Sequence, residues 1–497
     1  PGSAGAGVLC AAGRKGKGTV MKRQEENRGP AVDMQGNQEP VPDMTCEQAV
    51  DYIYASWQKA DPDRQWDVPD SRKRHPELTA SWLSKPVSVP TALVTGSKGK
   101  GSTARMLAAL LEKDGPCGLL TSPHILDFRE RIRLGGSMIG CRDFSRLMGE
   151  AKACLDTVAV PSGQFISPIG SQAMTARLYF EENHAAFQVF ECGKGVQFDD
   201  VGSIPHETAL VTPVFKEHLR ELGGSLEAIA RDKAHILQPG TRTLVMARQE
   251  QAVRKIFRDR AQSLGVRVLE YGRDFRASNL QRTEDGIRFD VHTPDNEYRD
   301  VLLPTLAAFQ AENCALALAA SEVMAGKPSD PALLKSLNFA GRQEVLRRSP
   351  LWLLDACINR ESACQLADSL RALDVKDALL VLAVPDDKDP AGTARILAPF
   401  AGEIRICPVT SGHYRITEDQ CRILWNLGVP VNWCPSMDAA LADRLCETVC
   451  DRGPARQNYP VILAGTTAFV SDVYRWMQKQ RKPADSLNGQ GFPAGSR

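Results

Sequence analysis

The sequence predicts an α/β protein with an N-terminal, mostly parallel sheet domain of the P-loop ATPase kind and a smaller, Rossmann-like C-terminal α/β domain. Three observations support this fold class. Short apolar runs alternate with amphipathic stretches from Cys46 onward, a loop of glycines and lysines joins one such run to a helical pattern, and the alternation restarts after Pro350. Buried strands followed by helices are typical of parallel sheets that are covered on both faces.

Length and charge limit the possible functions. The chain has 497 residues, with 61 Lys and Arg against 60 Asp and Glu. This length is too great for one ordinary core, and the charge balance gives no overall field that favours nucleic acid or an anionic membrane. No apolar run approaches the roughly 20 residues that span a bilayer, and the N-terminus lacks the apolar core of a signal peptide. We expect a cytoplasmic monomer without nucleic-acid or membrane partners.

The cysteines indicate a reducing environment. All 14 are scattered without a CxxC pair, and several lie in apolar runs such as FECGKG and LLDACI. This distribution favours reduced core thiols over a disulfide framework or a zinc site.

Composition divides the chain into four parts. Residues 1–43 are rich in Gly, Pro, Gln and charge and predict a disordered extension, in which Met21 is an alternative natural start. Residues 44–342 are expected to form the larger N-terminal α/β domain and residues 343–481 the C-terminal α/β domain. Residues 482–497 are polar, rich in Gly and Pro, and predict a flexible tail.

Apolar runs give the expected elements of the first domain. The expected strands are Thr91–Thr95, Gly118–Thr121, Ala186–Cys192, Leu210–Val214 and Thr243–Ala247. A polar segment with turn residues, Gly286–Val301, predicts a hairpin, and the helix Gln310–Met324 follows it.

The second domain repeats the alternation. Its expected elements are the strands Trp352–Asp355, Ala378–Val384, Glu403–Val409 and Val461–Gly465, the helices Glu361–Leu373 and Gly392–Pro399, and a last helix after Gly465.

The loop GSKGKGS, residues 96–102, ends a strand and begins a helix. Backbone N–H groups of such a loop, together with a helix N-terminus, form a concave anion site that suits a polyphosphate. The spacing is shorter than G-x-x-x-x-G-K-[ST], because Gly101 stands between Lys100 and Ser102. Phosphate binding is favoured over the alternative of a solvent-exposed Gly/Lys loop.

Two motifs carry a resemblance to a known family. VTGSKGKGST at 94–103, followed by LTSPHILDFRERIR at 120–133, resembles folylpolyglutamate synthase and dihydrofolate synthase of the Mur ligase family. Further segments follow in the family's order over about 430 residues, and a chance match does not explain this shared order. They are FECGKGVQFD from 190, EHLRELG from 217, IARDKA from 229, FQAEN from 309, FAGR from 339, DDKD from 386 and LAGTTAFV from 463.

This resemblance implies an ATP-dependent amide ligase with Mg²⁺, which adds L-glutamate to a folate or also to dihydropteroate. A carboxylate would attack the γ-phosphorus to give an acyl phosphate, and an amine would then displace phosphate. Such chemistry requires mainly cations and oriented groups.

The resemblance also assigns residues. Phosphate contacts fall on Gly96, Ser97, Lys98, Gly99, Lys100, Gly101, Ser102 and Thr103. Metal ligands fall on Ser122, Glu191 and His218, with Lys233 as a carbamylated ligand of a second Mg²⁺. Catalytic roles fall on Lys100, His218, Lys233 and Arg342. Without the resemblance, Ser122 is as well explained as a helix cap, His218 as a structural histidine, and Lys233 as an exposed helix lysine.

Three further positions would contact the nucleotide. Gln310 and Asn313 lie one helical turn apart, which suits reading of the adenine edge. Asp355 ends the first strand of the second unit, where open α/β sheets bind ligands. Taken singly, each is equally compatible with a cap or a surface ion pair. His124 and Arg129–Arg131 resemble the region that approaches the folate, although an alternating charge run is usually a solvated face.

The sequence departs from the family at several of these places. Ile358 occupies the position where the family has a phosphate-contacting histidine, and Val196 replaces the second glycine of the family's Gly-x-Gly-Gly. Loss of one such donor typically lowers the rate about 10²–10³-fold. Further departures are Val201, Gly202, Glu217 and Phe309.

Three alternatives therefore stay open. The first is a ligase for another carboxylate. The second is a catalytically weak paralogue that binds ATP or folate, and the third is a P-loop nucleotide kinase, which leaves the second α/β unit unexplained.

Overall fold

The computed structural model describes residues 44–60, 68–283, 285–410, 414–445 and 459–480. All of them belong to one compact unit, Pro42–Arg497. The expected N-terminal extension, 1–43, and the expected tail, 482–497, lie outside the described residues. Within the described part of the chain, no helix has the length and apolarity needed to cross a bilayer.

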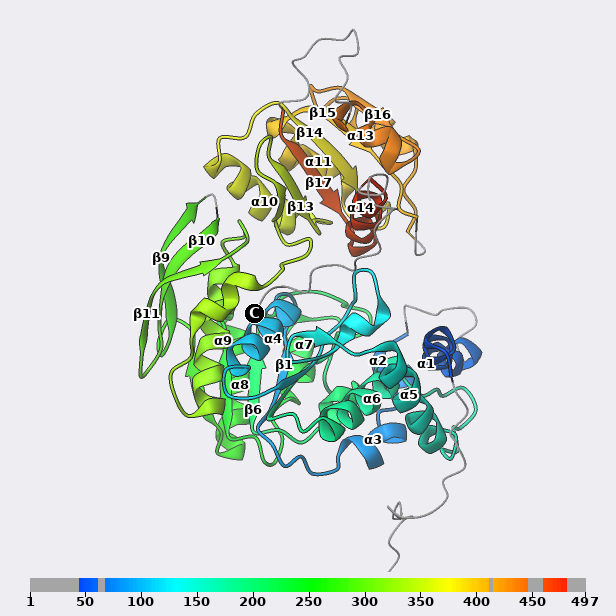
Figure 1. The fold of residues 1–497 in the computed structure, drawn as a ribbon, viewed down its shortest axis with the longest axis vertical. Coiled ribbons are helices and arrows are strands. Elements are labelled where there is room, and N and C mark those ends of the chain that lie inside the picture. Colours follow the sequence, from blue (N-terminus) through cyan, green and yellow to red (C-terminus); the bar gives the residue numbers. More distant parts are fainter. Residues whose placement is uncertain (1–43, 61–67, 284, 411–413, 446–458, 481–497) are drawn as a thin grey trace, which may run out of the picture. The chain divides into compact units, whose positions relative to one another are not determined.

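An eight-stranded sheet forms the larger part of the fold, in the order β4-β3-β2-β5-β1-β6-β7-β8 (Figure 1). The six neighbouring strands β2-β5-β1-β6-β7-β8 pair in parallel. At one edge, β3 pairs antiparallel with β2, and β4 pairs antiparallel with β3. The strands are β1 Thr91–Thr95, β2 Cys117–Leu120, β3 Ile132–Leu134, β4 Ser137–Met138, β5 Phe187–Glu191, β6 Thr208–Val211, β7 Thr243–Met246 and β8 Arg267–Glu270. Each expected strand of the first domain is present.

Helices cover both faces of this sheet, because successive strand residues point to opposite sides. Leu93 of β1 packs in one core cluster, and its neighbours Ala92 and Val94 pack in another. The second cluster holds the helices α4 Lys100–Leu111 and α9 Gln310–Ala325. The first holds α1 Cys46–Ala60, α3 Glu77–Leu83, α5 Cys141–Leu155, α6 Pro168–Glu182, α7 Leu226–Ala234 and α8 Gln251–Leu264.

A three-stranded antiparallel sheet precedes α9. Strands β10 Gly286–His292 and β11 Glu297–Leu303 form the expected hairpin, and β9 Arg276–Thr283 pairs with β10 on its other side. The sequence did not predict β9, because its segment RASNLQRT is mostly polar and none of its residues is buried.

A six-stranded sheet, in the order β12-β13-β17-β14-β15-β16, has its own core (Figure 1). Its strands are β12 Glu344–Arg347, β13 Trp352–Asp355, β14 Ala378–Ala383, β15 Ala401–Ile406, β16 Val431–Trp433 and β17 Val461–Gly465. Its helices are α10 Arg360–Ala372, α11 Pro390–Leu397, α12 Asp419–Leu424, α13 Met437–Leu445 and α14 Thr467–Gln480. The predicted fold class is confirmed, while the boundary at 342/343 stays a prediction.

One cysteine pair corrects the expectation of reduced thiols. Cys46 at the start of α1 and Cys141 at the start of α5 form a disulfide, with their Cα atoms 5.9 Å apart. The nine other cysteines of the described segments are free. The paired cysteines are 95 residues apart in sequence, and only the packing of α1 against α5 brings them together.

We predict that Gly118→Ala lowers the free energy of unfolding by about 1–3 kcal/mol, because overpacking a filled core forces neighbours to move. A Cβ atom at Gly118 of β2 would lie 2.5 Å from the Phe180 ring of α6. Urea denaturation measures the change. The added Phe180→Leu substitution should relieve part of it, so strictly additive effects of the two substitutions would contradict this packing argument.

Candidate active site

A cavity of about 510 Å³ lies where the carboxyl ends of the central strands meet residues of the six-stranded sheet. Many residues expected from the sequence line it: Ser97, Lys98, Gly99, Lys100, Gly101, Ser102, Ser122, Glu191, Asn313, Arg342 and Asp355. Gly96, Thr103, Gln310, His218 and Lys233 are not among its lining residues.

The loop after β1 is shaped by its glycines. Gly96 and Gly99 have φ angles of +136° and +88°, which other residues rarely adopt. A Cβ atom would lie 1.9 Å from Thr212 Oγ1 at Gly96 and 2.7 Å from Asn313 Oδ1 at Gly99. These positions therefore require glycine both for the backbone conformation and for the close approach of neighbouring segments.

Helix α4 begins at Lys100, with Gly99 as its N-cap and no side chain capping its first N–H groups. Those N–H groups face a cavity that is also lined by the Lys98 and Lys100 side chains. Lys100 Nζ donates to the carbonyl of Gly96 at 3.1 Å, which holds its ammonium against the loop. Unpaired N–H groups, a helix N-terminus and two ammonium groups together suit a polyphosphate.

Glu191 ends strand β5 inside this cavity with only 4% of its surface exposed. Burial raises the pKa of Glu191, while Lys100, the Ser122 N–H and Arg342 oppose that rise. The Ser122 N–H donates to Glu191 Oε2 at 2.8 Å. A carboxylate beside a serine hydroxyl is a set of hard oxygen donors that fits Mg²⁺, which usually completes its shell with phosphate oxygens and water.

The loop also needs glycine at Gly101. A Cβ atom at this position would lie 3.1 Å from Glu191 Oε2, so the bare backbone lets the carboxylate approach the start of α4.

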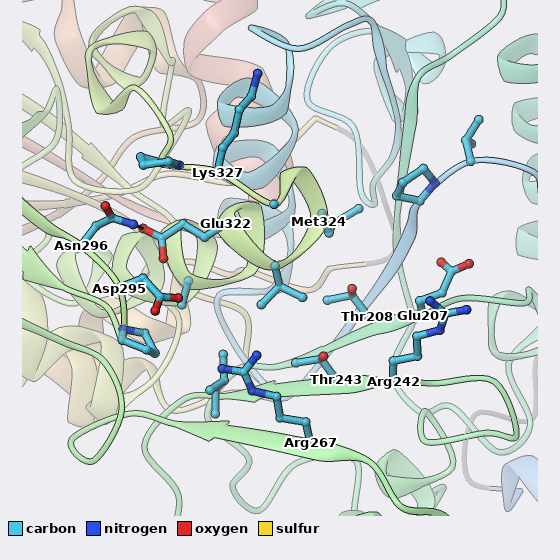
Figure 2. A pocket seen from close by; sticks show the side chains of 18 of the residues that line it. Glu207, Thr208, Arg242, Thr243, Arg267, Asp295, Asn296, Glu322, Met324 and Lys327 are labelled. Carbon is cyan, nitrogen blue, oxygen red and sulfur yellow. Dashed lines mark hydrogen bonds between the residues drawn. The ribbon is translucent and has the colours of Figure 1, made fainter.

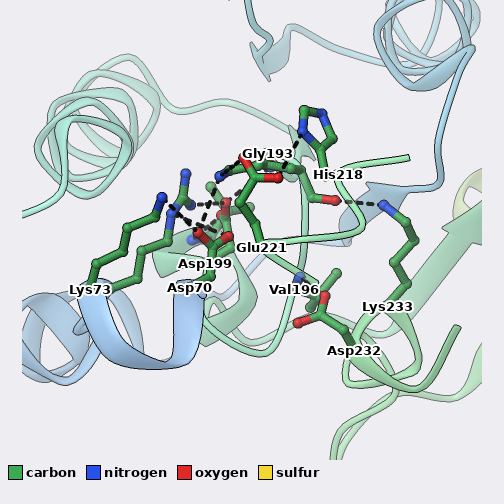
Figure 3. Close-up of polar contacts among 12 residues, drawn as sticks. Asp70, Lys73, Gly193, Val196, Asp199, His218, Glu221, Asp232 and Lys233 are labelled. Carbon is green, nitrogen blue, oxygen red and sulfur yellow. Dashed lines mark hydrogen bonds and ion pairs between the residues drawn. The ribbon is translucent and has the colours of Figure 1, made fainter. Parts of the chain in front are cut away.

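His218 lies apart from Ser122 and Glu191 in this structure. Its φ angle is +46°, and its Nδ1 lies 3.6 Å from a Glu221 carboxylate oxygen, with 46% of the imidazole side chain exposed (Figure 3). In the described segments, no group of three or more His, Cys, Asp and Glu is placed to hold a metal ion. The role of His218 as a metal ligand stays a prediction.

Lys233 is fully buried, which excludes the alternative of an exposed helix lysine. Its Nζ donates to the carbonyls of Gly96 at 3.0 Å and Lys194 at 2.6 Å. It also lies 3.1 Å from Glu217 Oε1, and a dashed line from Lys233 in Figure 3 marks this ion pair. Burial lowers the pKa of Lys233, and Glu217 acts in the opposite direction. Glu217, a departure from the family pattern, thus supplies the counter-charge of this lysine.

A partly buried ion-pair network includes Lys194, and Figure 3 labels its members Asp70, Asp199 and Glu221. Lys194 Nζ contacts Asp70 at 3.1 Å and Glu221 at 3.0 Å. Arg74 lies 3.3 Å from Asp199, whose pKa is raised to about 6 by burial and lowered in part by Arg74. The network joins the short helix α2 Asp70–Lys73 to the loops that follow β5 and β6.

Val196 lies in the core and does not line the cavity. Its N–H donates to Asp232 Oδ1 at 2.8 Å, and a Cβ atom at Gly202 would lie 2.5 Å from the Val196 carbonyl oxygen. Val196 and Gly202, two of the departures, are therefore fitted to each other. Ile358, by contrast, does line the cavity.

Gln310 and Asn313 support the loop after β1. Gln310 is fully buried, and its Nε2 donates to Ser102 Oγ at 3.1 Å. Asn313 Nδ2 donates to Gln310 Oε1 at 2.9 Å. Since the amide of Gln310 is used within the protein, Asn313 is the one of the pair that faces the cavity, and reading of adenine stays a prediction.

Arg342 and Asp355 form the part of the wall nearest the six-stranded sheet. Arg342 donates to the carbonyl of Gly341 at 3.0 Å. Asp355, the last residue of β13, accepts from the Gln343 N–H at 2.9 Å. Burial raises the pKa of Asp355 to about 6, although the Gln343 N–H, Arg342 and Lys98 lower it.

The motif after β2 is internally paired and is not a solvated face. Arg131 Nε donates to His124 Nδ1 at 3.0 Å. Burial, and to a smaller extent the charge of Arg131, lower the pKa of His124 to about 4. Arg129 pairs with Asp127 at 2.6 Å. Ser471 of α14 donates to the Ile125 carbonyl at 2.6 Å, which joins this loop to a helix of the six-stranded sheet.

Two arginines of the cavity wall were missed. Arg105 and Arg133 both line it. Arg105 follows Ser102 by three residues in α4 and so shares its helix face, a signal that the sequence contained. Arg133 lies between two apolar residues of β3, and this alternation could have indicated its orientation.

A larger cavity, of about 810 Å³, lies at the other end of the strands (Figure 2). It is lined by Thr208, Thr243 and Arg267, the first residues of β6, β7 and β8. Glu322 on its wall accepts from Asn296 Nδ2 at 2.9 Å. Open α/β sheets bind ligands at their carboxyl ends, so the smaller cavity is the candidate active site.

Comparison with known proteins finds one matching domain family and several similar proteins. Residues 94–321 match the Mur ligase middle domain. A probable bifunctional folylpolyglutamate synthase/dihydropteroate synthase of Haloferax volcanii is 32% identical over 303 residues, which is 60% of this chain and 36% of the relative. Folylpolyglutamate synthase of Lacticaseibacillus casei is 25% identical over 395 residues, which is 76% of this chain and 88% of the relative.

Solved structures share the fold. The Mycobacterium tuberculosis folylpolyglutamate synthase complexed with ADP and AMPPCP matches with a TM-score of 0.70 at 22% identity, over 85% of this chain and 98% of that one. The chain spans only 36% of the length of the Haloferax volcanii relative and 46% of a second probable bifunctional relative, from Halobacterium salinarum.

We predict that Asp355→Asn stabilises the protein by about 1–3 kcal/mol at pH 7.5 and by less at pH 5. The pKa of Asp355 is raised from 3.8 to about 6 in the folded protein. The free energy of unfolding of the wild type therefore falls as the pH rises from about 4 to 6, because the buried carboxyl loses its proton. Asparagine keeps the acceptor for Gln343 without the charge. Urea unfolding at both pH values measures the difference, and an equal gain at the two pH values would contradict the raised pKa.

Proposed function

We propose that the chain is a member of the Mur ligase family and an ATP-dependent carboxylate–amine ligase that adds L-glutamate to a folate. The match of residues 94–321 to the Mur ligase middle domain and the similarity to folylpolyglutamate synthases support this proposal. Glutamylation of tetrahydrofolate is the leading activity, and ligation of glutamate to dihydropteroate is a second one. The observation that carries the proposal is one cavity in which the glycine loop with Lys100 faces Glu191, Arg342 and Asp355.

The loop after β1 is the proposed site of the ATP triphosphate. Backbone N–H groups at the start of α4 and the ammonium of Lys100 would contact the β- and γ-phosphates. Lys233 would act behind the loop, because its bond to the Gly96 carbonyl fixes the turn from which these N–H groups project. Asn313 and Asp355 are the proposed contacts to the nucleoside.

Ser122 and Glu191 fit a Mg²⁺ ion and would hold it beside the phosphates. The ion would supply charge neutralisation during phosphoryl transfer. His218 would have to turn toward the cavity to join them. Lys233 has the lowered pKa that favours the neutral amine needed for carbamylation, and a carbamylated Lys233 would release its bonds to the Gly96 and Lys194 carbonyls.

The reaction would proceed in two displacements. A carboxylate oxygen of the acceptor attacks the γ-phosphorus, ADP leaves, and an acyl phosphate forms. The amine of L-glutamate then attacks the acyl carbon, loses a proton and expels inorganic phosphate, which leaves an amide. Lys100 and Arg342 would stabilise the charge on the transferring phosphoryl group, and a cavity between two sheets protects the acyl phosphate from water.

A second candidate is a weakly active relative that binds ATP or a folate. Ile358 favours it, because this side chain lines the cavity and offers no hydrogen-bond donor to an oxyanion. A ligase for a different carboxylate is the third candidate. The domain limits 44–342 and 343–481, the monomeric state and the cytoplasmic location accompany these proposals as predictions.

We predict that the purified protein, given ATP, Mg²⁺, L-glutamate and tetrahydrofolate, releases phosphate and forms a product heavier by one glutamate. Lys100→Ala should lower turnover at least about 100-fold, because it removes a cation from the developing charge. Lys255→Ala, on the exposed face of α8 where Lys255 pairs with Asp259, serves as the matched control. Nucleotide binding without turnover on any acceptor would instead support the weakly active relative.

We also predict that Ile358→His raises kcat about tenfold or more with little change in KM for ATP, because a donor to the transferring phosphoryl group is restored. Steady-state kinetics with saturating glutamate test this. A variant that binds ATP as wild type does but gains no rate would show that Ile358 does not limit the reaction.

A further inference from the structure

Two arginines of the cavity wall have no role in the mechanism above. Arg105 lies on α4, about one turn beyond the phosphate loop, and Arg133 lies on β3. Both line the same cavity as Lys100 and Ser122. The phosphate loop has its own ammonium groups and N–H donors, so a triphosphate bound there does not require these arginines.

The guanidinium groups are poorly compensated. Within the described residues, the Arg105 side chain makes no hydrogen bond or ion pair, and Arg133 donates only to the Gly136 carbonyl, at 3.3 Å. Burial lowers the pKa of Arg105, and Arg133 lowers it further. Burial also lowers the pKa of Arg133. A partly buried guanidinium that keeps its charge without a partner indicates a site for an anion.

One carboxylate lies near both arginines but is already engaged. Glu130 acts on Arg105 and Arg133 electrostatically. Its oxygens accept from the backbone N–H groups of Ile125, Leu126 and Asp127, at 3.0–3.1 Å. Glu130 therefore organises the loop after Ser122 and leaves net positive charge at the pair.

We propose that Arg105 and Arg133 bind the unreactive carboxylate of a glutamyl substrate. The planar guanidinium fork matches a carboxylate in two parallel hydrogen bonds, which gives both affinity and orientation. The assignment rests on the proposed ligase function. It makes the pair a determinant of specificity, since a substrate that lacks this carboxylate leaves the two charges unmatched.

Two sources can supply this carboxylate: the terminal glutamyl unit of the acceptor, or the incoming L-glutamate. Acceptors distinguish them. Tetrahydrofolate carries a free carboxylate beside the one that reacts, whereas the single carboxylate of dihydropteroate is consumed in the reaction. A pair that serves the acceptor matters only for tetrahydrofolate, while a pair that serves incoming glutamate matters with both.

The test uses Arg105→Met and Arg133→Met, which keep the side-chain length and remove the charge. If the acceptor is the source, KM for tetrahydrofolate should rise at least about tenfold, and KM for dihydropteroate should stay within about twofold. If incoming glutamate is the source, KM for glutamate should rise at least about tenfold with either acceptor. Arg→Lys at each position should restore part of the loss.

Arg146→Met is the matched control, because Arg146 lies on α5, pairs with Glu150 and Glu182 and is absent from the cavity wall. Calorimetry with a non-hydrolysable ATP analogue should give the same affinity for wild type and all variants. Weaker binding of this analogue by the two methionine variants, or unchanged KM for both acceptors and glutamate, would overturn the assignment.

Calorimetry with folate and pteroate separates this assignment from the proposed reaction. If wild type binds folate at least about tenfold more tightly than pteroate and the methionine variants abolish that preference, the pair binds an acceptor carboxylate even if no turnover is found. Equal binding of folate and pteroate by wild type, together with no turnover, would reject both the pair's role and the proposed function.

Discussion

The buried, unmodified side chain of Lys233 is the contact on which the arrangement of the loops in this structure depends. It bonds the Gly96 carbonyl in the loop after β1, the Lys194 carbonyl in the loop after β5, and Glu217 in the loop after β6. Three strand-end loops are thereby fixed to one point that water does not reach. Loss of the ammonium would leave buried acceptors and a carboxylate without a partner, which typically destabilises a protein by several kcal/mol.

The cavity places charges where burial disfavours them. Glu191 and Asp355 both have pKa values raised by burial, and Arg105 and Arg133 have pKa values lowered by it. Such groups reduce the stability of the folded chain unless a ligand with complementary charge is bound. A cationic loop, buried carboxylates and unmatched guanidiniums in one cavity are the arrangement expected for a protein that binds phosphates, a metal ion and a carboxylate together.

The sequence predicted the strands whose side chains are buried on both faces, because β1, β13 and β17 are mostly apolar and buried at every residue. It missed β9, which is polar, and β16, which has three residues and none of them buried. It also missed the short strands β3, β4, β8 and β12. The loop glycines were predictable because a glycine-rich turn between a strand and a helix suits a phosphate. Glu191 was predictable because an unpaired carboxylate at the end of an apolar strand costs free energy. The orientation of His218 depends on a positive φ and on Glu221, and the Cys46–Cys141 pair depends on helix packing, so neither has a local signal.

The hydrogen bond between Ser471 of α14 and the Ile125 carbonyl joins a helix of the six-stranded sheet to the loop that begins at Ser122. That same loop presents its N–H to Glu191 and is organised by Glu130. We therefore expect a shift of α14 to move this loop and the Ser122 N–H that donates to Glu191. Ligand binding beside α14 is therefore expected to affect ligand binding beside Ser122 and Glu191, so that the two binding events are cooperative.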